Sequence, residues 1–223
     1  TKTGEVTQII PHKDGYTPKD GNGTPLEPVN PAKPEEGYKP PKITDPKANI
    51  KITYEKDNQK AKVKFVSVDD KGVETPLDTK YNIDDLTGKS GDKIPEEKVQ
   101  ARVDVLKSMG YDVVDNPFDQ DPTFDTKKEI DQEFTIKVKP QVSTAKPVYV
   151  VEGDKPSSEK LKDAVTTKGN EKTVDETKLP DTTDKVGDDT LTAPVTVTYG
   201  SGDNKREETV NVPIKVVAGY PQI

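Results

Sequence analysis

Catalytic chemistry in this chain would depend on one histidine and on carboxylates, because its 223 residues include no cysteine. A serine or cysteine nucleophile needs an adjacent base, which is most often a histidine. The single histidine, His12, lies in a segment rich in Pro, Gly, Lys and Asp, with no nucleophile beside it. We therefore interpret His12 as a solvent-exposed loop residue, and we predict that the chain is not an enzyme and has no catalytic residues.

A possible metal site lies in a loop that concentrates oxygen ligands. Calcium binds several carboxylate and amide oxygens at once. The spacing here does not match an EF-hand, and Pro117 and Pro122 favour a rigid, solvent-exposed loop. We predict no cofactor and keep calcium as the alternative for this loop. Its candidate ligands are Asp112, Asp115, Asn116, Asp119, Asp121 and Asp125.

Asn211 and Lys215 raise the alternative of an intramolecular isopeptide bond. Such a bond requires a lysine, an asparagine and an acid that meet in an apolar core, and Glu207 or Glu208 would supply the acid. These residues fall mainly at the polar, outward steps of an alternating strand. We therefore predict that they are surface residues.

The composition describes an acidic chain with few apolar residues. Its formal charge is -7, and 29% of its residues are hydrophobic against 34% charged. Nucleic acids and anionic membranes both require a basic face, so neither is an expected partner. There is no apolar run of membrane-spanning length, no signal peptide and no sorting motif. The absence of cysteine, together with 20 prolines, favours the outer face of a Gram-positive cell over the cytosol.

Three segments differ in character. Residues 1–48 have a proline every few positions between Pro25 and Pro34, which favours extended backbone. A Gly-Tyr-X-Pro sequence begins at Gly15 and recurs 22 residues later at Gly37, and Gly-Tyr-Pro follows at 219–221. We predict a Pro-rich linker or the end of a preceding repeat. Its tyrosines either pin the segment onto a neighbouring module or belong to a flexible linker.

Residues 49–140 have the pattern of a β-grasp module. Apolar and polar residues alternate in 50–54 and 61–68, and the turn Asp69-Asp70-Lys71-Gly72 leads into a strand at 73–77. A helix is predicted between Pro95 and Gly110, with Val99, Val103 and Leu106 on one face. Strands at 111–114 and 133–138 complete one helix against a small mixed sheet.

Residues 141–223 have the pattern of a small antiparallel, Ig-like β-sandwich. We predict a strand at 147–151, a short helix capped by Ser157 or Ser158, and strands at 194–199 and 209–217. Residues 200–204 have the composition of a hairpin turn. The predicted fold class is therefore mainly β (α+β) and elongated, with a β-grasp (ubiquitin-like) module followed by this sandwich.

The first module resembles the mucin-binding (MucBP or Mub-type) repeats of lactobacilli. The similarity lies in the strand and turn at residues 63–72 and in the run Leu86-Thr87-Gly88-Lys89-Ser90-Gly91-Asp92. The Gly110-Tyr111 pair that leads into the next strand, and the linker at 25–31, are also similar to that family. The resemblance covers residues 49–140.

The second module resembles the Rib (alpha-like) repeats of Gram-positive surface proteins. The similarity lies in residues 192–200 and 208–216, and Lys178-Leu179-Pro180 is similar to a loop of that family. Gly200-Ser201 stands where the family often has Pro-Asp. The resemblance covers residues 145–218.

Together the two resemblances imply a wall-anchored, extracellular adhesin that binds mucin glycans or glycoproteins. The chain would then be a monomeric part of a multi-repeat protein. The alternatives are a purely structural stalk without a ligand and an immunoglobulin-binding module. The ligand-binding residues stay unknown, although Tyr81, Tyr111 and Phe118 are the aromatic residues expected to be exposed for glycan contact.

Overall fold

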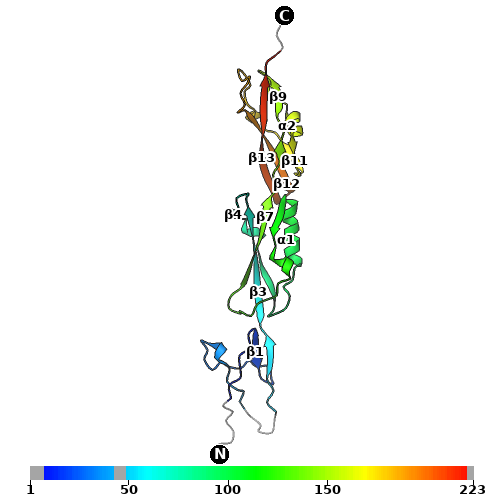
Figure 1. Cartoon of the computed structure of the whole chain (residues 1–223). Coiled ribbons are helices and arrows are strands. Elements are labelled where there is room, and N and C mark those ends of the chain that lie inside the picture. Colours follow the sequence, from blue (N-terminus) through cyan, green and yellow to red (C-terminus); the bar gives the residue numbers. More distant parts are fainter. Residues whose placement is uncertain (1–7, 43–48, 220–223) are drawn as a thin grey trace, which may run out of the picture. The chain divides into compact units, whose positions relative to one another are not determined.

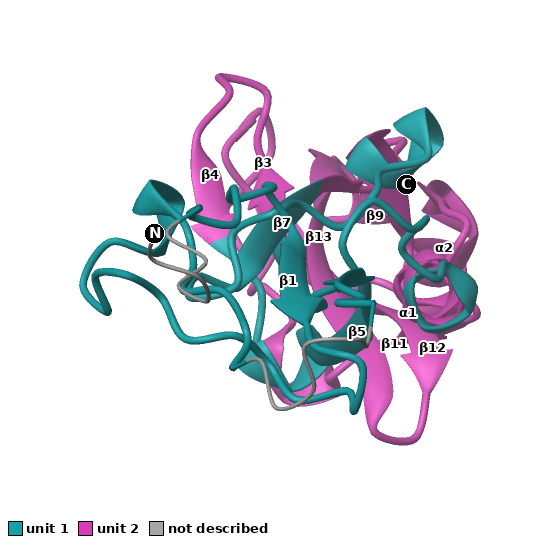
Figure 2. Ribbon diagram, turned by 90° about the horizontal axis from the view of Figure 1, so that it is seen from below, with its two compact units in different colours: residues 1–66, 76–99, 116–136 teal, residues 67–75, 100–115, 137–223 magenta. Residues whose placement is uncertain are grey.

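The computed structural model describes residues 8–42 and 49–219, and within them the protein is mainly β. The chain divides into two compact units, which Figure 2 colours separately. One unit comprises residues 1–66, 76–99 and 116–136, and the other comprises 67–75, 100–115 and 137–223. Strand β3 (Asn58–Val68), helix α1 (Glu97–Ser108) and strand β7 (Gln132–Pro140) each contribute residues to both units.

The described part of the N-terminal segment is folded. Strand β1 (Tyr16–Lys19) pairs antiparallel with β2 (Thr53–Lys56), and a short 3-10 helix, η1, spans Pro34–Glu36 (Figure 1). Tyr38 is buried, and its backbone bridges to Ile10 and to Pro28. Tyr38 therefore ties parts of the N-terminal segment to one another, whereas the prediction was that its tyrosines would pin the segment onto a neighbouring module. Of the Gly-Tyr-Pro sequence at 219–221, the residues from Tyr220 onward lie outside the described part of the chain.

A single residue, Asp57, separates β2 from β3 and is held by three groups. Its amide donates to the carbonyl of Gly15 (2.8 Å), and its carbonyl accepts from the amide of Ser90 (2.9 Å). Its carboxylate accepts a hydrogen bond from the hydroxyl of Thr17. The connection between these two strands is thus fixed by its own hydrogen bonds.

A five-stranded sheet has the order β4–β3–β7–β6, and β5 also pairs with β3. The register between β3 and β5 shifts between Ala61 and Val63. The remaining bounds are β4 (Glu74–Pro76), β5 (Ile83–Lys89), β6 (Tyr111–Asp115), and the 3-10 helices η2 (Thr79–Tyr81) and η3 (Pro117–Gln120).

Helix α1 forms where the sequence predicts it. Val99, Val103 and Leu106 are each at most 2% exposed, so the predicted apolar face is buried. Gly110 adopts φ +78°, the left-handed conformation that commonly ends a helix.

Residues 144–217 form a second set of strands. One sheet has the order β11 (Glu171–Thr173), β12 (Thr192–Ser201), β13 (Asn204–Val217) and β9 (Val148–Val151). A separate pair joins β8 (Thr144–Ala145) to β10 (Val165–Thr166), and helices α2 (Ser158–Ala164) and η4 (Glu176–Lys178) lie between strands in the chain. Their apolar core contains Leu161, Val165, Val195, Val197, Val212 and Ile214.

The hairpin β12–β13 confirms the predicted strands and turn. Ser201 pairs with Asn204, which leaves a two-residue loop. Gly202 opens that loop with φ +59°, which suits a type II′ turn. Ser157 caps α2 by accepting from the amide of Lys160, as predicted. The expectation of a purely antiparallel arrangement is wrong in one place, because β9 pairs parallel to β13.

Candidate functional site

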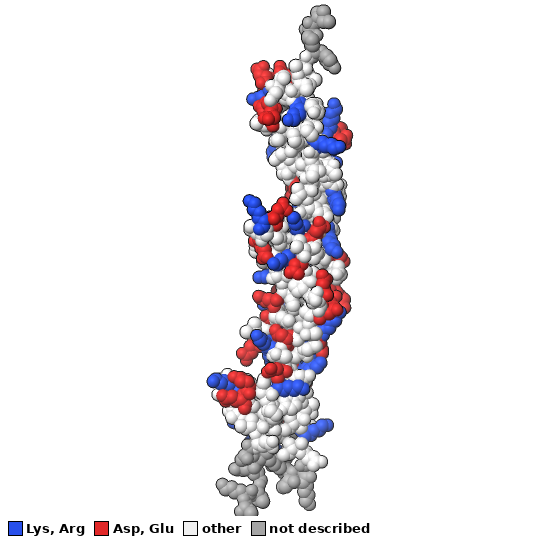
Figure 3. All heavy atoms as spheres, viewed as in Figure 1, with Lys and Arg blue, Asp and Glu red and all other residues white. Residues whose placement is uncertain are grey.

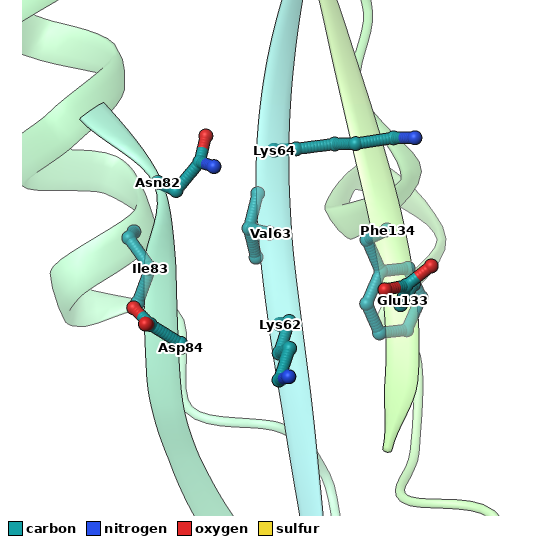
Figure 4. Close-up of a pocket in the computed structure, with 8 residues that line it drawn as sticks. All are labelled: Lys62, Val63, Lys64, Asn82, Ile83, Asp84, Glu133 and Phe134. Carbon is teal, nitrogen blue, oxygen red and sulfur yellow. The ribbon is translucent and has the colours of Figure 1, made fainter. Parts of the chain in front are cut away.

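A hollow on the sheet is lined by residues of β3, β5 and β7, all within one compact unit (Figure 4). Its volume is about 240 Å³. Val63 and Ile83 are buried at its base, whereas Lys64, Asp84 and Glu133 are exposed. The other lining residues are Lys62, Asn82 and the half-buried Phe134.

The lining combines donors, acceptors and an aromatic ring. Lys64 extends from β3 toward β7, where Phe134 and Glu133 lie (Figure 4). Lys62 is partly engaged, because its ammonium lies 3.4 Å from a carboxylate oxygen of Asp131. A ligand with many hydroxyls can accept from ammonium groups and donate to carboxylates. The hollow therefore suits a glycan better than it suits a purely apolar ligand.

The phenylalanine of this hollow is held in place by a second ring. Phe134 lies against Phe118, with ring centroids 5.0 Å apart and planes inclined by 54°. This is a favourable tilted geometry for two aromatic rings. Phe118 is only 4% exposed, so it supports the hollow from the interior.

A second and larger groove, of about 580 Å³, lies between the N-terminal segment and the loop 126–130. Its aromatic lining is His12, Tyr16 and Tyr38, and its polar lining includes Thr17 and Asp57. Burial raises the pKa of the Tyr38 hydroxyl, and the nearby charge of Asp57 raises it further. Tyr38 is therefore a neutral hydroxyl at physiological pH.

His12 lies in a loop, as predicted, but its side chain is only partly exposed to solvent. Its side chain is 25% exposed, and its ring stacks on Tyr38 with centroids 6.4 Å apart. Its Nε2 lies 2.9 Å from a carboxylate oxygen of Asp14. The sequence around His12 is polar, but the buried tyrosine offers a ring face on which the imidazole packs.

The expectation that three aromatic side chains are exposed is largely wrong. Tyr81 is 7% exposed and Phe118 is 4% exposed, so neither can stack on a ligand as placed. Tyr111 is half-buried and lies under the guanidinium of Arg206. Tyr81 and Phe118 lie on the 3-10 helices η2 and η3, which the sequence pattern did not predict.

Four of the candidate calcium ligands between residues 112 and 125 each contact a different partner. Asp112 accepts from the side-chain amide of Gln141, and Asn116 caps η3 by accepting from the amide of Phe118. A hydrogen bond from Lys93 holds the pKa of Asp121 below its usual range, and Asp125 accepts from the amide of Lys127. In the described parts of the chain, no three His, Asp or Glu side chains gather closely enough to hold a metal ion.

The isopeptide candidates lie on a strand whose inward positions are occupied by other residues. Val210, Val212, Ile214 and Val216 are buried along β13, whereas Asn211 is exposed. Lys215 and Glu208 are half-buried, and Glu207 is exposed. Asn211 pairs with Pro194 while Lys215 pairs with Tyr149, so different strands flank the two residues.

Sequence reasoning missed Lys62, Lys64 and Phe134 as lining residues. The signal for the lysines was present, because they are the outward steps on either side of the buried Val63. Charged residues at outward steps are common on any sheet, so this signal alone did not single them out.

Charges of both signs are intermingled on the surface of the described residues. Figure 3 shows lysine and arginine side chains interspersed with aspartate and glutamate on the face in view. Several form close pairs, such as Lys98 with Asp85 (2.6 Å) and Lys137 with Glu74 (2.6 Å). Exposed pairs of this kind contribute little stability individually. None of the helices in residues 8–42 and 49–219 has the length and apolar character needed to cross a membrane.

Comparison with known proteins identifies one relevant family. Residues 59–140 match the family model described as a mucin binding domain, which confirms the predicted resemblance for that part of the chain. No curated protein sequence matches the chain. A solved structure, the type 2 repeat of the mucus binding protein MUB from Lactobacillus reuteri, is 14% identical over 71% of this chain and 97% of that chain, with a TM-score of 0.28. That identity and TM-score are both low, so only the family match bears on function.

Proposed function

We propose that the chain is a fragment of a bacterial surface adhesin whose residues 59–140 bind mucin glycoproteins. The family match over these residues is the observation that carries the proposal. The hollow of Figure 4 lies within the matched residues and offers ammonium and carboxylate groups to a glycan.

Immobilised mucin tests this proposal. The full chain should be retained above a control protein, and replacing Lys64, Asp84 and Glu133 together by alanine should reduce retention. The matched control replaces Lys160, Asp163 and Glu159, which have the same charges and are exposed on α2. Equal retention of the two triple variants would reject the hollow as the binding surface. No retention of the unaltered chain would reject mucin binding itself.

We also propose the finer organisation that the resemblances imply. Residues 49–140 would form a β-grasp module, and 141–223 a Rib-like, Ig-like sandwich that extends the adhesive region from a wall-anchored, monomeric protein. Residues 1–48 would be a Pro-rich linker or the end of a preceding repeat. The order of β3, β5, α1, β6 and β7 along the chain supports the first assignment. The long hairpin β12–β13 supports the second. A purely structural stalk is the alternative, and it predicts no ligand on a glycan array.

Immunoglobulin binding is a second candidate because β6 stands at one end of the strand order. An edge strand presents unpaired backbone groups to which another chain can add a strand. Surface plasmon resonance with pooled IgG tests this alternative. Binding to immobilised IgG above an immobilised control protein would favour it, and binding no greater than to the control would reject it.

A further inference from the structure

Arg206 on β13 contacts three backbone carbonyls that lie far from it in sequence. Its Nε donates to the carbonyl of Met109 at 3.0 Å. Its Nη2 donates to the carbonyls of Gly110 at 3.2 Å and Gln141 at 3.1 Å. All four residues belong to the same compact unit.

Two tyrosine rings hold the guanidinium in this position. Its central carbon lies 4.2 Å from the ring centroid of Tyr199 and 5.2 Å from that of Tyr111. A guanidinium over an aromatic face is favourable, and more so where water is partly excluded. Arg206 is half-buried, so its donors are directed at the carbonyls rather than at solvent.

The contacted carbonyls lie immediately after helix α1. The last carbonyls of a helix have no partner within the helix, and a cation near them is stabilising. Helix α1 ends at Ser108, and the carbonyls of Met109 and Gly110 follow at once. Arg206 therefore holds the turn that directly follows the helix, although it lies 96 residues beyond Gly110.

Gly110 fits this arrangement in two ways. Its φ of +78° is strained for any residue with a Cβ. A Cβ at this position would lie 2.4 Å from Cδ1 of Tyr199 and 2.8 Å from Nη2 of Arg206. The close approach of hairpin and helix end thus requires a glycine.

The connecting residues after β7 are bonded to the same elements. The amide of Gln141 donates to the carbonyl of Gly110 at 2.8 Å. The amide of Ser143 donates to the carboxylate of Glu208 at 2.9 Å. The amide of Lys146 donates to the carbonyl of Ala164 at 2.9 Å. Three of the first six residues after β7 are therefore tied by their amides to the helix end, to β13 or to α2.

We propose that Arg206, supplied from the C-terminal hairpin, fixes the two residues that follow helix α1 and thereby holds the end of the helix in place. The family match ends at residue 140, so it includes the helix but not the arginine that fixes the residues after it. The C-terminal strands then supply a contact that stabilises the end of a helix within the matched residues. This inference is independent of the ligand assigned above.

Hydrogen exchange of the full chain tests the proposal. Replacing Arg206 by alanine should accelerate exchange at the amides of Met109, Gly110 and Gln141 about tenfold or more, because hydrogen bonds from a charged donor are strong. The amide of Leu161 in α2 should stay within about twofold of its original rate, since local opening need not spread through a unit's core. The matched control is Lys205→Ala, an exposed neighbour, which should leave all four rates unchanged.

Two further variants keep the test decisive. Arg206→Lys should give intermediate rates, because one ammonium cannot reproduce the planar fork of a guanidinium. Gly110→Ala should in turn accelerate exchange in the hairpin around Arg206. Unchanged rates at Met109 and Gly110 in Arg206→Ala would overturn the proposal. Equal acceleration at Leu161 would also overturn it, since Arg206 would then serve only general stability.

Discussion

Replacing Glu208 by glutamine should destabilise the protein by about 1.5 kcal/mol at pH 7. The Glu208 carboxylate accepts from the amide of Ser143 (2.9 Å), from its hydroxyl (2.6 Å) and from the hydroxyl of Tyr199 (2.9 Å). A hydrogen bond to a charged acceptor contributes about 1.5–3 kcal/mol, against about 0.5–1.5 kcal/mol for a neutral one. Glutamine keeps one acceptor oxygen but turns a donor toward one of these groups. Because Glu208 is only half-buried, the expected loss lies at the lower end of the range for a charged acceptor.

The pH dependence of this loss has a defined sign. Burial raises the pKa of Glu208, but the hydrogen bonds from Ser143 and Tyr199 lower it by more, so the net pKa is below its usual value. The carboxylate therefore stabilises the fold above its unfolded pKa of about 4.3, and this stability is lost as the pH falls through the lower folded-state pKa. The difference between the two proteins should be largest at pH 7 and should shrink toward pH 3.

Urea unfolding followed by far-ultraviolet circular dichroism measures this difference at each pH. The melting temperature should also fall by about 3–6 °C at pH 7. The matched control is Glu207→Gln, because Glu207 is the exposed neighbour on the same strand and should change stability by less than about 0.5 kcal/mol. A loss that stays constant between pH 7 and pH 3, or that equals the control, would refute the assignment of Glu208 as a charged acceptor.

Four other substitutions have defined outcomes. Gly200→Ala should cost about 3 kcal/mol in unfolding free energy, because φ is +86° and the new Cβ would lie 2.2 Å from a carbonyl oxygen across the hairpin. Gly202→Ala should cost about 1 kcal/mol, because the new Cβ would meet no atom within 4 Å. Equal costs of the two substitutions in thermal melts would contradict this reasoning. Leu161→Ala should cost about 2–5 kcal/mol by chemical denaturation, because the side chain is fully buried. Thr17→Val should cost about 1 kcal/mol and speed hydrogen exchange at Asp57, since the carboxylate loses its donor; an unchanged exchange rate would show that the backbone bonds alone hold this residue.

The sequence predicted those elements whose signals are local. Helix α1 and the hairpin β12–β13 formed where the apolar spacing and turn residues indicated, and Ser157 caps α2 as its position suggested. Periodicity and capping act over a few residues, so they can be read without the fold. The match to a mucin binding domain likewise confirmed a resemblance carried by one short run of residues.

The sequence did not predict features that depend on distant partners. Strand β5 has buried residues at Ile83 and Leu86, three apart, because the register shifts opposite it on β3, and this breaks the alternation that identifies a strand. The sheet hollow was missed for the same reason, since Lys64 and Phe134 come together only when β3 and β7 are in place. The burial of Tyr81 likewise depends on tertiary packing rather than on local polarity.

The parallel pairing of β9 with β13 determines how residues 141–219 respond to tension. Val148 lies opposite Ile214 and Val151 opposite Val217, so a pull through residues 141 and 219 drags the two strands past each other lengthwise. Under such shear the cross-strand bonds of the pair must break together, whereas an antiparallel hairpin pulled at its open end separates one bond at a time.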